Sequence, residues 1–405
     1  MERAYKYRIY PNAEQRGQIE NTLGACRWLW NHCLELCNAS WEVNRRSFTP
    51  NQLMKHLTVL KNTSAPWLYE IDNTALQSSI KNLGLAFQNF FRRVKKGEKP
   101  GYPNYKSRHA SSQSYTAKYK KGAKVMRGNK VMIPKLGLVK CRISRIPEGR
   151  IVNVTVRRTA TGQYYATFCC MDCPDPEMPM GDEPIIGIDA GLHDLMTRSD
   201  GVKVENHKHL RKSERKLKRA QRSLSRKKRG SNNYRKQRKR LARIHERVSN
   251  QRRDAIHKAT TDAVRESQAI AVEDLNVKGM VKNHNLAKSV ADASMSEMIR
   301  QLAYKCQWYG RAFTKVDRWF PSTQVCGCCG EIAGPKGKSK LDVREWTCPS
   351  CGTKHDRDLN AARNIARKGA EILGIPWDAR EFKACGEGKD LALSATLREA
   401  GIPRL

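Results

Sequence analysis

Three acidic residues lie next to segments that are expected to be buried, where a charged side chain does not stabilise the core. Asp189 ends the apolar run 185–188, Glu273 ends the apolar run 269–272, and Asp358 opens a helical pattern after a Cys-x-x-Cys pair. Short apolar runs of this kind are typical of buried strands, so two carboxylates are expected at strand ends. In a chain with a formal net charge of +38, acids placed in this way indicate a divalent-metal site beside a phosphodiester.

The composition restricts the partner of this chain. Its 405 residues include 77 Lys and Arg against 39 Asp and Glu, and such an excess repels itself until it meets a polyanion. We find no apolar run of membrane-spanning length and no signal-peptide segment at the start, so we expect no membrane association. Most of the 14 cysteines are scattered among apolar neighbours, which favours core thiols in a reducing, cytoplasmic compartment.

The N-terminal part of the chain predicts a sheet into which a helical domain is inserted. Residues 3–9 alternate as a strand does, and short strands with glycine-bearing turns recur between 105 and 178. We therefore expect residues 1–11 and 105–178 to form one β-barrel or curled sheet.

Residues 12–104 show helical periodicity. One helix is expected to follow a capping box formed by Asn12 and Gln15, and a second is expected from about Asn73 to Lys96. The segment is therefore expected to be a small helical domain.

The C-terminal part alternates strands and helices. The expected order is a strand ending at Asp189, its hairpin partner, a basic helical hairpin over 207–266, a strand ending at Glu273, a helix, a strand and a last helix. This multidomain α+β order is compatible with a ribonuclease-H-like fold over residues 184–320 and 355–372, in which acids from two strands and a helix meet.

Two local details complete the C-terminal layout. The helix after the strand that ends at Glu273 is expected to begin at a capping box formed by Ser294 and Glu297. Residues 373–405 show little periodicity, and we expect them to form a flexible tail.

The three acids predict a two-metal site. Carboxylates brought together repel one another, and one would take up a proton unless cations compensated. Two Mg²⁺ or Mn²⁺ ions about 3.5–4 Å apart would compensate, and would also polarise a scissile phosphate and an attacking water. We assign Asp189 as the bridging ligand and Glu273 and Asp358 as its flanking partners. Asp356 remains an alternative for the third position.

Two Cys-x-x-Cys pairs within residues 321–354 predict a second, different metal centre. The four cysteines are Cys326, Cys329, Cys348 and Cys351. Each pair can place two thiolates on one ion, and four thiolates leave no open position on Zn²⁺. We therefore expect a structural zinc ribbon, in which the neighbouring Cys328 is not a ligand, that holds Asp358 in place and contacts a nucleic-acid strand.

The strongest charge run lies between the first two strand-ending acids. Residues 211–253 contain 20 Lys and Arg, while their acids are Glu214 and Glu246. Leucines and other apolar residues interrupt the basic residues at near-helical spacing, so we expect a folded hairpin rather than a solvated tail. Two such helices repel each other unless they meet a phosphate backbone. The candidate contacts near its turn are Lys227, Arg229, Arg238 and Arg240.

Tyrosines also accompany basic segments in the first half of the chain. They are Tyr102, Tyr105, Tyr115 and Tyr119. A tyrosine beside cations suits stacking on unpaired bases, although aromatic residues at such places are as often packing residues.

Four motifs together resemble the TnpB family, the transposon-encoded relatives of type V CRISPR effector nucleases. They are the Gly-Ile-Asp-Ala-Gly of 187–191, the Val-Glu-Asp-Leu-Asn of 272–276, the Phe-Pro-Ser-Thr-Gln-Val-Cys of 320–326 and the block 348–362. The resemblance runs from end to end except for about the last thirty residues.

The resemblance implies a RuvC-type nuclease domain with an inserted zinc ribbon, and a wedge β-barrel that carries an inserted helical recognition domain. It also implies a guide RNA transcribed from the transposon end and a double-stranded DNA target, in a bacterial or archaeal cell at the nucleoid. Asp189, Glu273 and Asp358 match the catalytic triad of the family. Gln77 matches a position that contacts the target-adjacent motif, with Asn73 and Thr74 in the same helix.

We therefore expect an RNA-guided DNA endonuclease that hydrolyses phosphodiesters with two metal ions next to a short protein-read motif. Three alternatives remain: a transposase of the same fold, a nucleic-acid-binding protein or repressor whose acids are structural, and a ribosomal or RNA-packaging protein. The acid order Asp, Glu, Asp opposes the first, because DDE transposases place Glu last.

Overall fold

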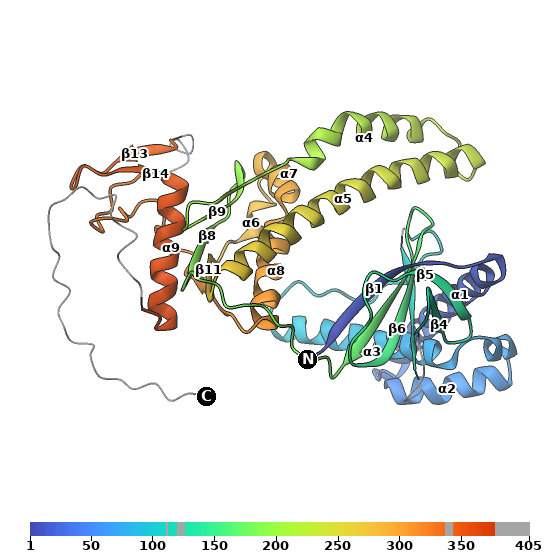
Figure 1. Ribbon diagram of the computed structural model, residues 1–405. Coiled ribbons are helices and arrows are strands. Elements are labelled where there is room, and N and C mark those ends of the chain that lie inside the picture. Colours follow the sequence, from blue (N-terminus) through green and yellow to red (C-terminus); the bar gives the residue numbers. More distant parts are fainter. Residues whose placement is uncertain (111, 120–125, 337–342, 377–405) are drawn as a thin grey trace. The chain divides into compact units, whose positions relative to one another are not determined.

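The computed structural model describes residues 1–110, 112–119, 126–336 and 343–376, which fall into two compact units (Figure 1). The first unit comprises Met1–Asp175 and Lys216–Glu246, and the second comprises the rest of the chain. The outer part of the basic hairpin thus packs with the first unit. Most of the expected tail, residues 377–405, lies outside the described residues.

The first unit contains a curled antiparallel sheet of seven strands in the order β2-β6-β7-β1-β5-β4-β3. Its strands are β1 (Arg3–Tyr10), β2 (Gln113–Lys118), β3 (Met126–Arg127), β4 (Lys130–Ile133), β5 (Gly137–Arg142), β6 (Arg150–Arg158) and β7 (Tyr164–Met171). The N-terminal strand β1 lies inside the sheet, where it pairs with β5 and β7, as the sequence predicts. Among the described residues the end strands β2 and β3 do not pair with each other, so the sheet is open.

The segment between β1 and β2 forms helices of the first unit. They are α1 (Ala13–Asn44), α2 (Pro50–Asn62), the 3₁₀ helix η1 (Pro66–Glu70) and α3 (Asn73–Lys95). The capping box of Asn12 and Gln15 at the start of α1 is confirmed. A second capping box, formed by Thr49 and Gln52, begins α2, a helix that was not predicted from the sequence.

The second unit is built on a five-stranded sheet in the order β10-β9-β8-β11-β12. These strands are β8 (Ile186–Asp189), β9 (Asp194–Arg198), β10 (Lys203–Glu205), β11 (Ala269–Glu273) and β12 (Ala312–Val316). The first three form an antiparallel meander, and β8, β11 and β12 are parallel. A mixed sheet of this kind is the expected ribonuclease-H-like layout.

The other elements of the C-terminal part flank this sheet or extend the chain away from it. They are α4 (His209–Ser225), α5 (Asn232–Glu266), α6 (Val277–Met280), α7 (His284–Ala293), α8 (Met295–Trp308), the ribbon strands β13 (Glu345–Thr347) and β14 (Lys354–Asp356), and α9 (Arg357–Leu373).

The predicted capping box at the start of α8 is wrong. Ser294 has a left-handed backbone (φ 54°) and makes no side-chain cap, because it is also the residue that ends α7. Glu297 instead accepts hydrogen bonds from Arg300 at 2.7 Å and from Gln301 at 2.9 Å. The short helix α7 was not expected, and its direct junction with α8 leaves no extended residue to serve as a cap.

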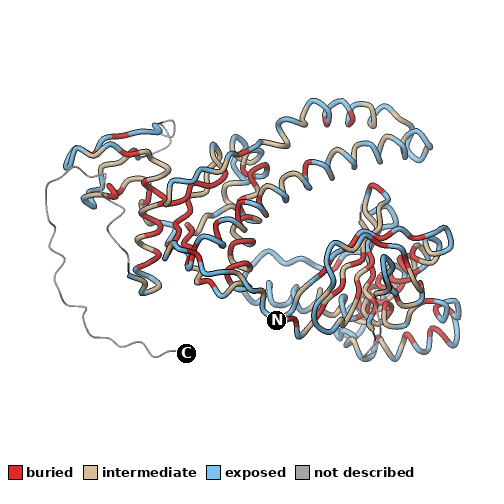
Figure 2. The backbone as a smooth tube through the Cα atoms, viewed as in Figure 1, coloured by how far each residue is buried: buried red, intermediate tan, exposed pale blue. Residues whose placement is uncertain are grey.

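The two faces of the five-stranded sheet bury different helices. Ile270 and Val272 of β11 belong to a core with the inner part of α5 and with α8. Ala269 and Ala271, which alternate with them, belong to a core with Ile365, Ala366 and Ala370 of α9. Figure 2 shows both cores as buried segments on either side of the sheet. This alternation decides on which face the strand-ending acids lie.

Candidate active site and metal centre

Strand alternation puts two of the predicted acids on the face covered by α9. Ile186 and Ile188 of β8 point to the core with α5 and α8, so Gly187 and Asp189 point to the other face. In β11, Glu273 follows Ala271 by two residues and therefore also points toward α9. The parallel register pairs Val272 with Ile188, which places Glu273 beside Asp189 on the neighbouring strand.

Glycines allow α9 to approach the sheet closely. A Cβ atom on Gly187 would lie 2.1 Å from the carbonyl oxygen of Ala362 and 2.4 Å from the nitrogen of Ala366. A Cβ atom on Gly369 would lie 2.3 Å from the Cβ of Ala271. The helix therefore crosses β8 with its N-terminal end toward Asp189. Asp358 lies four residues before Ala362, on the same helix face.

The electrostatics of Asp189 reflect this convergence. Burial, and after it the charges of Asp358 and Glu273, raise the pKa of its carboxyl to about 7, while Arg357 and Arg344 oppose the shift. The pKa of Glu273 is also raised, first by burial and then by Asp274. A bound cation would stabilise the charged form of a buried carboxylate such as Asp189, whose pKa is raised by burial and by neighbouring acids.

Asp356 and Asp358 have different surroundings. Asp356 is the N-cap of α9: its side chain accepts a hydrogen bond from the Leu359 nitrogen at 2.9 Å and forms an ion pair with Lys203 at 2.6 Å. Asp358 lies in the first turn of α9 and forms an ion pair with Arg344 at 3.1 Å. Its charge raises the pKa of Asp189. Because Asp356 is occupied as a cap, the geometry favours Asp358 as the third member of the acid cluster, defined as Asp189, Glu273 and Asp358.

The four cysteines of the ribbon come together in a thiol cluster. Cys326, Cys329, Cys348 and Cys351 present sulfur atoms that all lie within 4.8 Å of one another. Two of the Sγ–Sγ separations are 3.6 Å (Cys326 to Cys351) and 3.7 Å (Cys329 to Cys348). A tetrahedral ion with bonds of about 2.3 Å requires separations close to these, so the donor set fits Zn²⁺.

Both knuckles of the ribbon use the same local turn. The Gly330 nitrogen donates to the Cys326 carbonyl at 2.9 Å, and the Gly352 nitrogen donates to the Cys348 carbonyl at 2.9 Å. Both glycines have positive φ (82° and 71°), a conformation that favours glycine. The pattern Cys-x-x-Cys-Gly therefore presents two thiols on each turn.

Two buried asparagines that sequence reasoning did not select join the ribbon to α9. Asn360 donates to the Val325 carbonyl at 2.8 Å and accepts from the Gly327 nitrogen at 2.9 Å. Asn364, one turn later, donates to the carbonyls of Ser322 and Val325. The first knuckle is thereby bound to the helix that carries Asp358. Their spacing of four residues in an otherwise apolar helix face was the available signal.

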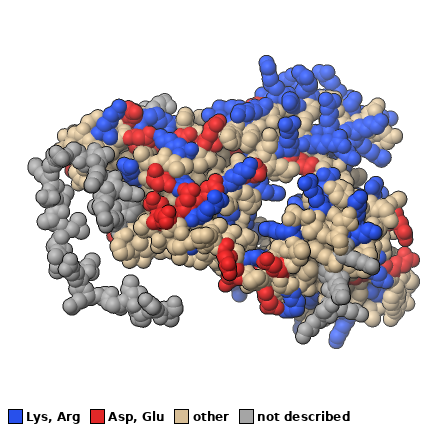
Figure 3. Space-filling model, viewed as in Figure 1, with Lys and Arg blue, Asp and Glu red and all other residues tan. Residues whose placement is uncertain are grey.

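The candidate nucleic-acid contacts of the hairpin lie at its outer end. Arg229, Arg238 and Arg240 are exposed and Lys227 is half-buried. Figure 3 shows Lys and Arg side chains covering the α4 and α5 region of the face in view. Leu217 and Ala220 of α4 and Val248 of α5 are buried, while most of the cations of these helices are exposed.

The tyrosines divide into two classes. Tyr115 is buried in the core of the first unit, and the Tyr119 hydroxyl donates to the Met132 carbonyl at 2.5 Å while its ring stacks on Phe168, so both are packing residues rather than stacking platforms for bases. Tyr102 and Tyr105 remain exposed, and both hydroxyls lie within hydrogen-bond distance of the Asn38 side chain.

The residues predicted to read a DNA motif lie together at the start of α3. Asn73 accepts a hydrogen bond from Lys61 at 2.7 Å, and the Thr74 hydroxyl accepts from the Lys118 nitrogen at 2.8 Å. Gln77 is half-buried one turn further along. Two of the three side chains are thus already engaged within the protein.

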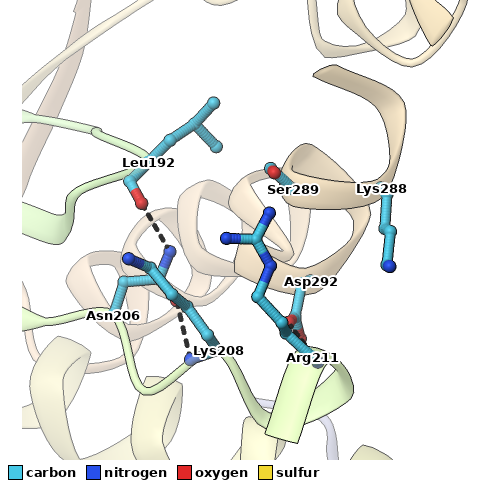
Figure 4. A pocket seen from close by; sticks show the side chains of 7 residues that line it. All are labelled: Leu192, Asn206, Lys208, Arg211, Lys288, Ser289 and Asp292. Atoms are coloured by element: carbon cyan, nitrogen blue, oxygen red, sulfur yellow. Dashed lines mark hydrogen bonds between the residues drawn. The ribbon is translucent and has the colours of Figure 1, made fainter. Parts of the chain in front are cut away.

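A polar pocket lies where α4 begins, in the second unit (Figure 4). Its lining residues are Leu192, Asn206, Lys208, Arg211, Lys288, Ser289 and Asp292. The buried Asp292 carboxylate accepts hydrogen bonds from the nitrogens of Leu210 and Arg211 and pairs with Arg252 at 3.1 Å. It therefore caps α4 from α7 and fixes the root of the basic hairpin.

Comparison with protein families gives matches to three segments of the chain. Residues 168–284 match a family described as "Probable transposase", and this segment contains β8 and β11. Residues 296–365 match one described as "Cas12f1-like, TNB domain", which contains the thiol cluster and Asp358, and residues 1–46 match "Helix-turn-helix domain".

Relatives cover the chain almost completely. A Streptomyces pristinaespiralis protein named "Putative RNA-guided DNA endonuclease" is 39% identical over 100% of this chain and 99% of its own length. An Escherichia coli (strain K12) protein named "Putative RNA-guided DNA endonuclease InsQ" is 32% identical over 95% of this chain and 94% of its own length. A Cas12f1 chain, solved with sgRNA and target DNA, shares the fold with a TM-score of 0.54 at 14% identity, over 90% of this chain and 98% of that one.

The fold and the site define a multidomain protein with a RuvC-like domain and a zinc-ribbon module. The chain belongs to the TnpB family. Among the described residues, each helix is too short or too polar to cross a bilayer.

Proposed function

We propose that this protein is an RNA-guided DNA endonuclease that hydrolyses phosphodiester bonds at the acid cluster. The observation that carries the proposal is the convergence of Asp189, Glu273 and Asp358 on one face of the sheet, with the raised pKa of Asp189 as its electrostatic consequence. The names of the two full-length relatives support the same activity.

The acid cluster supplies oxygen ligands of the kind that Mg²⁺ and Mn²⁺ prefer. Asp189, Glu273 and Asp358 would hold such ions through their carboxylate oxygens. When bound, the ions polarise the scissile phosphate and make water a better nucleophile. The protein's own part is to hold three carboxylates on rigid elements, so that little reorganisation is needed when the DNA strand arrives.

The zinc ribbon would act through α9. Asn360 and Asn364 bind the first knuckle to that helix, and Asp358 is in its first turn. A Zn²⁺ ion on the thiol cluster would therefore maintain the position of the third acid without contacting the reacting atoms.

The cations would hold the two nucleic acids. The exposed lysines and arginines of α4 and α5, together with Tyr102 and Tyr105, are the proposed contacts to the guide RNA or the opened DNA. Gln77, Asn73 and Thr74 are proposed to contact the target-adjacent motif. Base pairing with the guide would read the rest of the target, in the cytoplasm at the nucleoid.

The direct test begins with the RNA that copurifies with the full-length protein. A single species with a variable end supports a guide, whereas mixed ribosomal RNA opposes one. The complex is then given Mg²⁺ and a DNA library with a randomised flank beside a guide-matched target. Cleavage next to one flank sequence is the expected result, and intact DNA would contradict the proposal.

DNA strand transfer is a second candidate function, because residues 168–284 match a family described as "Probable transposase". Incubation with labelled transposon ends and a target plasmid separates the two activities. Joined products support a transposase, and linear cleaved products support the endonuclease.

A further inference from the structure

The turn after β12 presents a tryptophan to solvent. Trp319 is 85% exposed, more than any other large apolar side chain among the described residues. Tryptophan is usually well buried, because its large ring gains much from leaving water. An indole left this far in solvent contributes little to folding, so its place suggests contact with something outside the chain.

The backbone under Trp319 is held firmly. The Trp319 nitrogen donates to the Asp317 side chain at 2.8 Å. The neighbouring Arg318 donates to Asp274, from Nη2 to the carboxylate at 2.7 Å and from Nε to the carbonyl at 3.1 Å. Asp274 directly follows Glu273 of the acid cluster and donates its own N–H to the Val316 carbonyl at 3.0 Å. The exposed indole is therefore attached to the same hydrogen-bonded edge as an acid of the site.

The strand order places this edge beside the acid cluster. The parallel strands β8, β11 and β12 are neighbours, and their register pairs Glu273 with Val316, three residues before Trp319. Adjacent strands are about 4.8 Å apart, so the turn lies about 10 Å across the sheet from the strand of Asp189. A stacked nucleic-acid strand advances about 3.4 Å per nucleotide, so this separation corresponds to about three nucleotides.

We propose that Trp319 stacks on an unpaired base of the DNA strand that occupies the acid cluster. This inference rests on the proposed nuclease function and adds a residue that positions the strand a few nucleotides from the scissile bond. A protein-docking surface would present a patch of apolar side chains, whereas Trp319 follows the exposed Asp317 and Arg318, and the next residue, Phe320, packs against the core with α9. A single flat ring beside cations is the arrangement by which proteins hold single strands of any sequence.

The test uses short single-stranded DNA that carries one 2-aminopurine at successive positions, because stacking on an aromatic ring quenches its fluorescence. The protein is the full-length chain with Asp189→Asn, so that the strand binds without being cut. We expect one position to be quenched, and Trp319→Ala to remove that quenching and to weaken binding about tenfold. Trp319→Phe retains a ring and should retain most of both.

Trp41→Ala is the matched control, since Trp41 is 48% exposed and belongs to the other unit. Quenching that Trp319→Ala leaves intact, with unchanged binding, would overturn the proposal. A loss of binding that Trp319→Phe does not rescue would also overturn it. If the protein with intact Asp189 cuts no DNA in Mg²⁺ while the quenching still depends on Trp319, the stacking inference stands and the proposed nuclease function fails.

Discussion

The acid cluster and the thiol cluster are two anionic centres in one cationic chain, and they are assembled in opposite ways. The thiols come from two short turns separated by 18 residues, and each turn has the same glycine-dependent geometry. The acids come from residues 189, 273 and 358, and they meet through strand register and the packing of α9. One centre is local in sequence, and the other exists only in the folded domain.

The difference also concerns energy. Thiolates on a zinc ion form a closed set that stabilises its own turns, so the ion is part of the fold. The carboxylates instead are partly buried and close together, and burial first and the charges of Asp358 and Glu273 second raise the pKa of Asp189, so their convergence must be supported by the surrounding core. The acid cluster therefore lowers the stability of the fold, whereas the zinc ribbon raises it. The predictions below separate these two roles.

Removal of an acid should have the largest effect on activity and should leave the protein folded. Asp189→Ala and Asp358→Ala are each expected to lower the cleavage rate by about three orders of magnitude or more, because a ligand of the proposed ion pair is lost. Guided cleavage in Mg²⁺ and thermal unfolding are the measurements. Full cleavage by Asp189→Ala would refute the proposed site.

Removal of a thiol should affect both the fold and the activity. Cys348→Ser is expected to lower the zinc content and to reduce cleavage roughly ten- to a hundredfold, because the support of α9 through Asn360 and Asn364 is weakened. Zinc is measured by mass spectrometry. Cys169→Ser, a half-buried thiol of β7, is the control and should change neither quantity. Unchanged cleavage in a zinc-free variant would show that the ribbon does not position the acid.

The close packing of α9 on β8 can be tested by adding one methyl group at Gly187. Gly187→Ala places a Cβ 2.1 Å from the Ala362 carbonyl oxygen, so α9 must move, at a cost of about 1–3 kcal/mol of stability and with a large loss of cleavage. Gly17→Ala is the control, because its Cβ would meet nothing within 4 Å and alanine favours the helix. Equal stability and equal cleavage for both variants would contradict the packing described above.

The burial of Asp189, together with the repulsion from the other two acids, predicts a dependence of stability on pH. Folding raises the pKa of Asp189 from 3.8 to about 7, so between these values the folded protein keeps a proton that the unfolded chain has lost. The contribution of Asp189 to stability therefore falls as pH rises through this window. In buffer without divalent ions, Asp189→Asn should exceed the wild type in stability by about 1–3 kcal/mol at pH 7 and by much less near pH 4. Urea unfolding at several pH values measures the difference, and a constant difference would argue against it.

The smallest effect is expected at Asp356. Asp356→Ala removes the N-cap of α9 and should cost about 0.5–2 kcal/mol, with a modest loss of cleavage, while Asp356→Asn keeps the cap and should be nearly neutral. Comparison with Asp358→Ala assigns the third ligand. A severe loss of cleavage in Asp356→Asn together with an active Asp358→Ala would reverse the assignment.

Much of the order of helices and strands could be predicted from hydrophobic periodicity and from turn and capping residues. The long helices α1, α3 and α5, the strands that end in acids and the four thiols are local patterns, and each residue's neighbours along the chain carry the signal. The predictions failed where one residue serves two elements: Ser294 ends α7 and precedes α8, so its capping signal was misleading. Tyr115 was also ambiguous, because a core strand and a basic surface loop can share the same local composition.

By itself, the sequence determined the thiol cluster, the excess of cations and the identity of the candidate acids, because these depend on residue type and on spacings of a few residues. Only the tertiary structure decided that Asp189 and Glu273 lie on the α9 face, that Asp358 faces them while Asp356 caps the helix, and that Trp319 lies at the same edge. The physical reason is that register, close helix packing and competition between hydrogen-bond partners are settled between segments far apart in the chain.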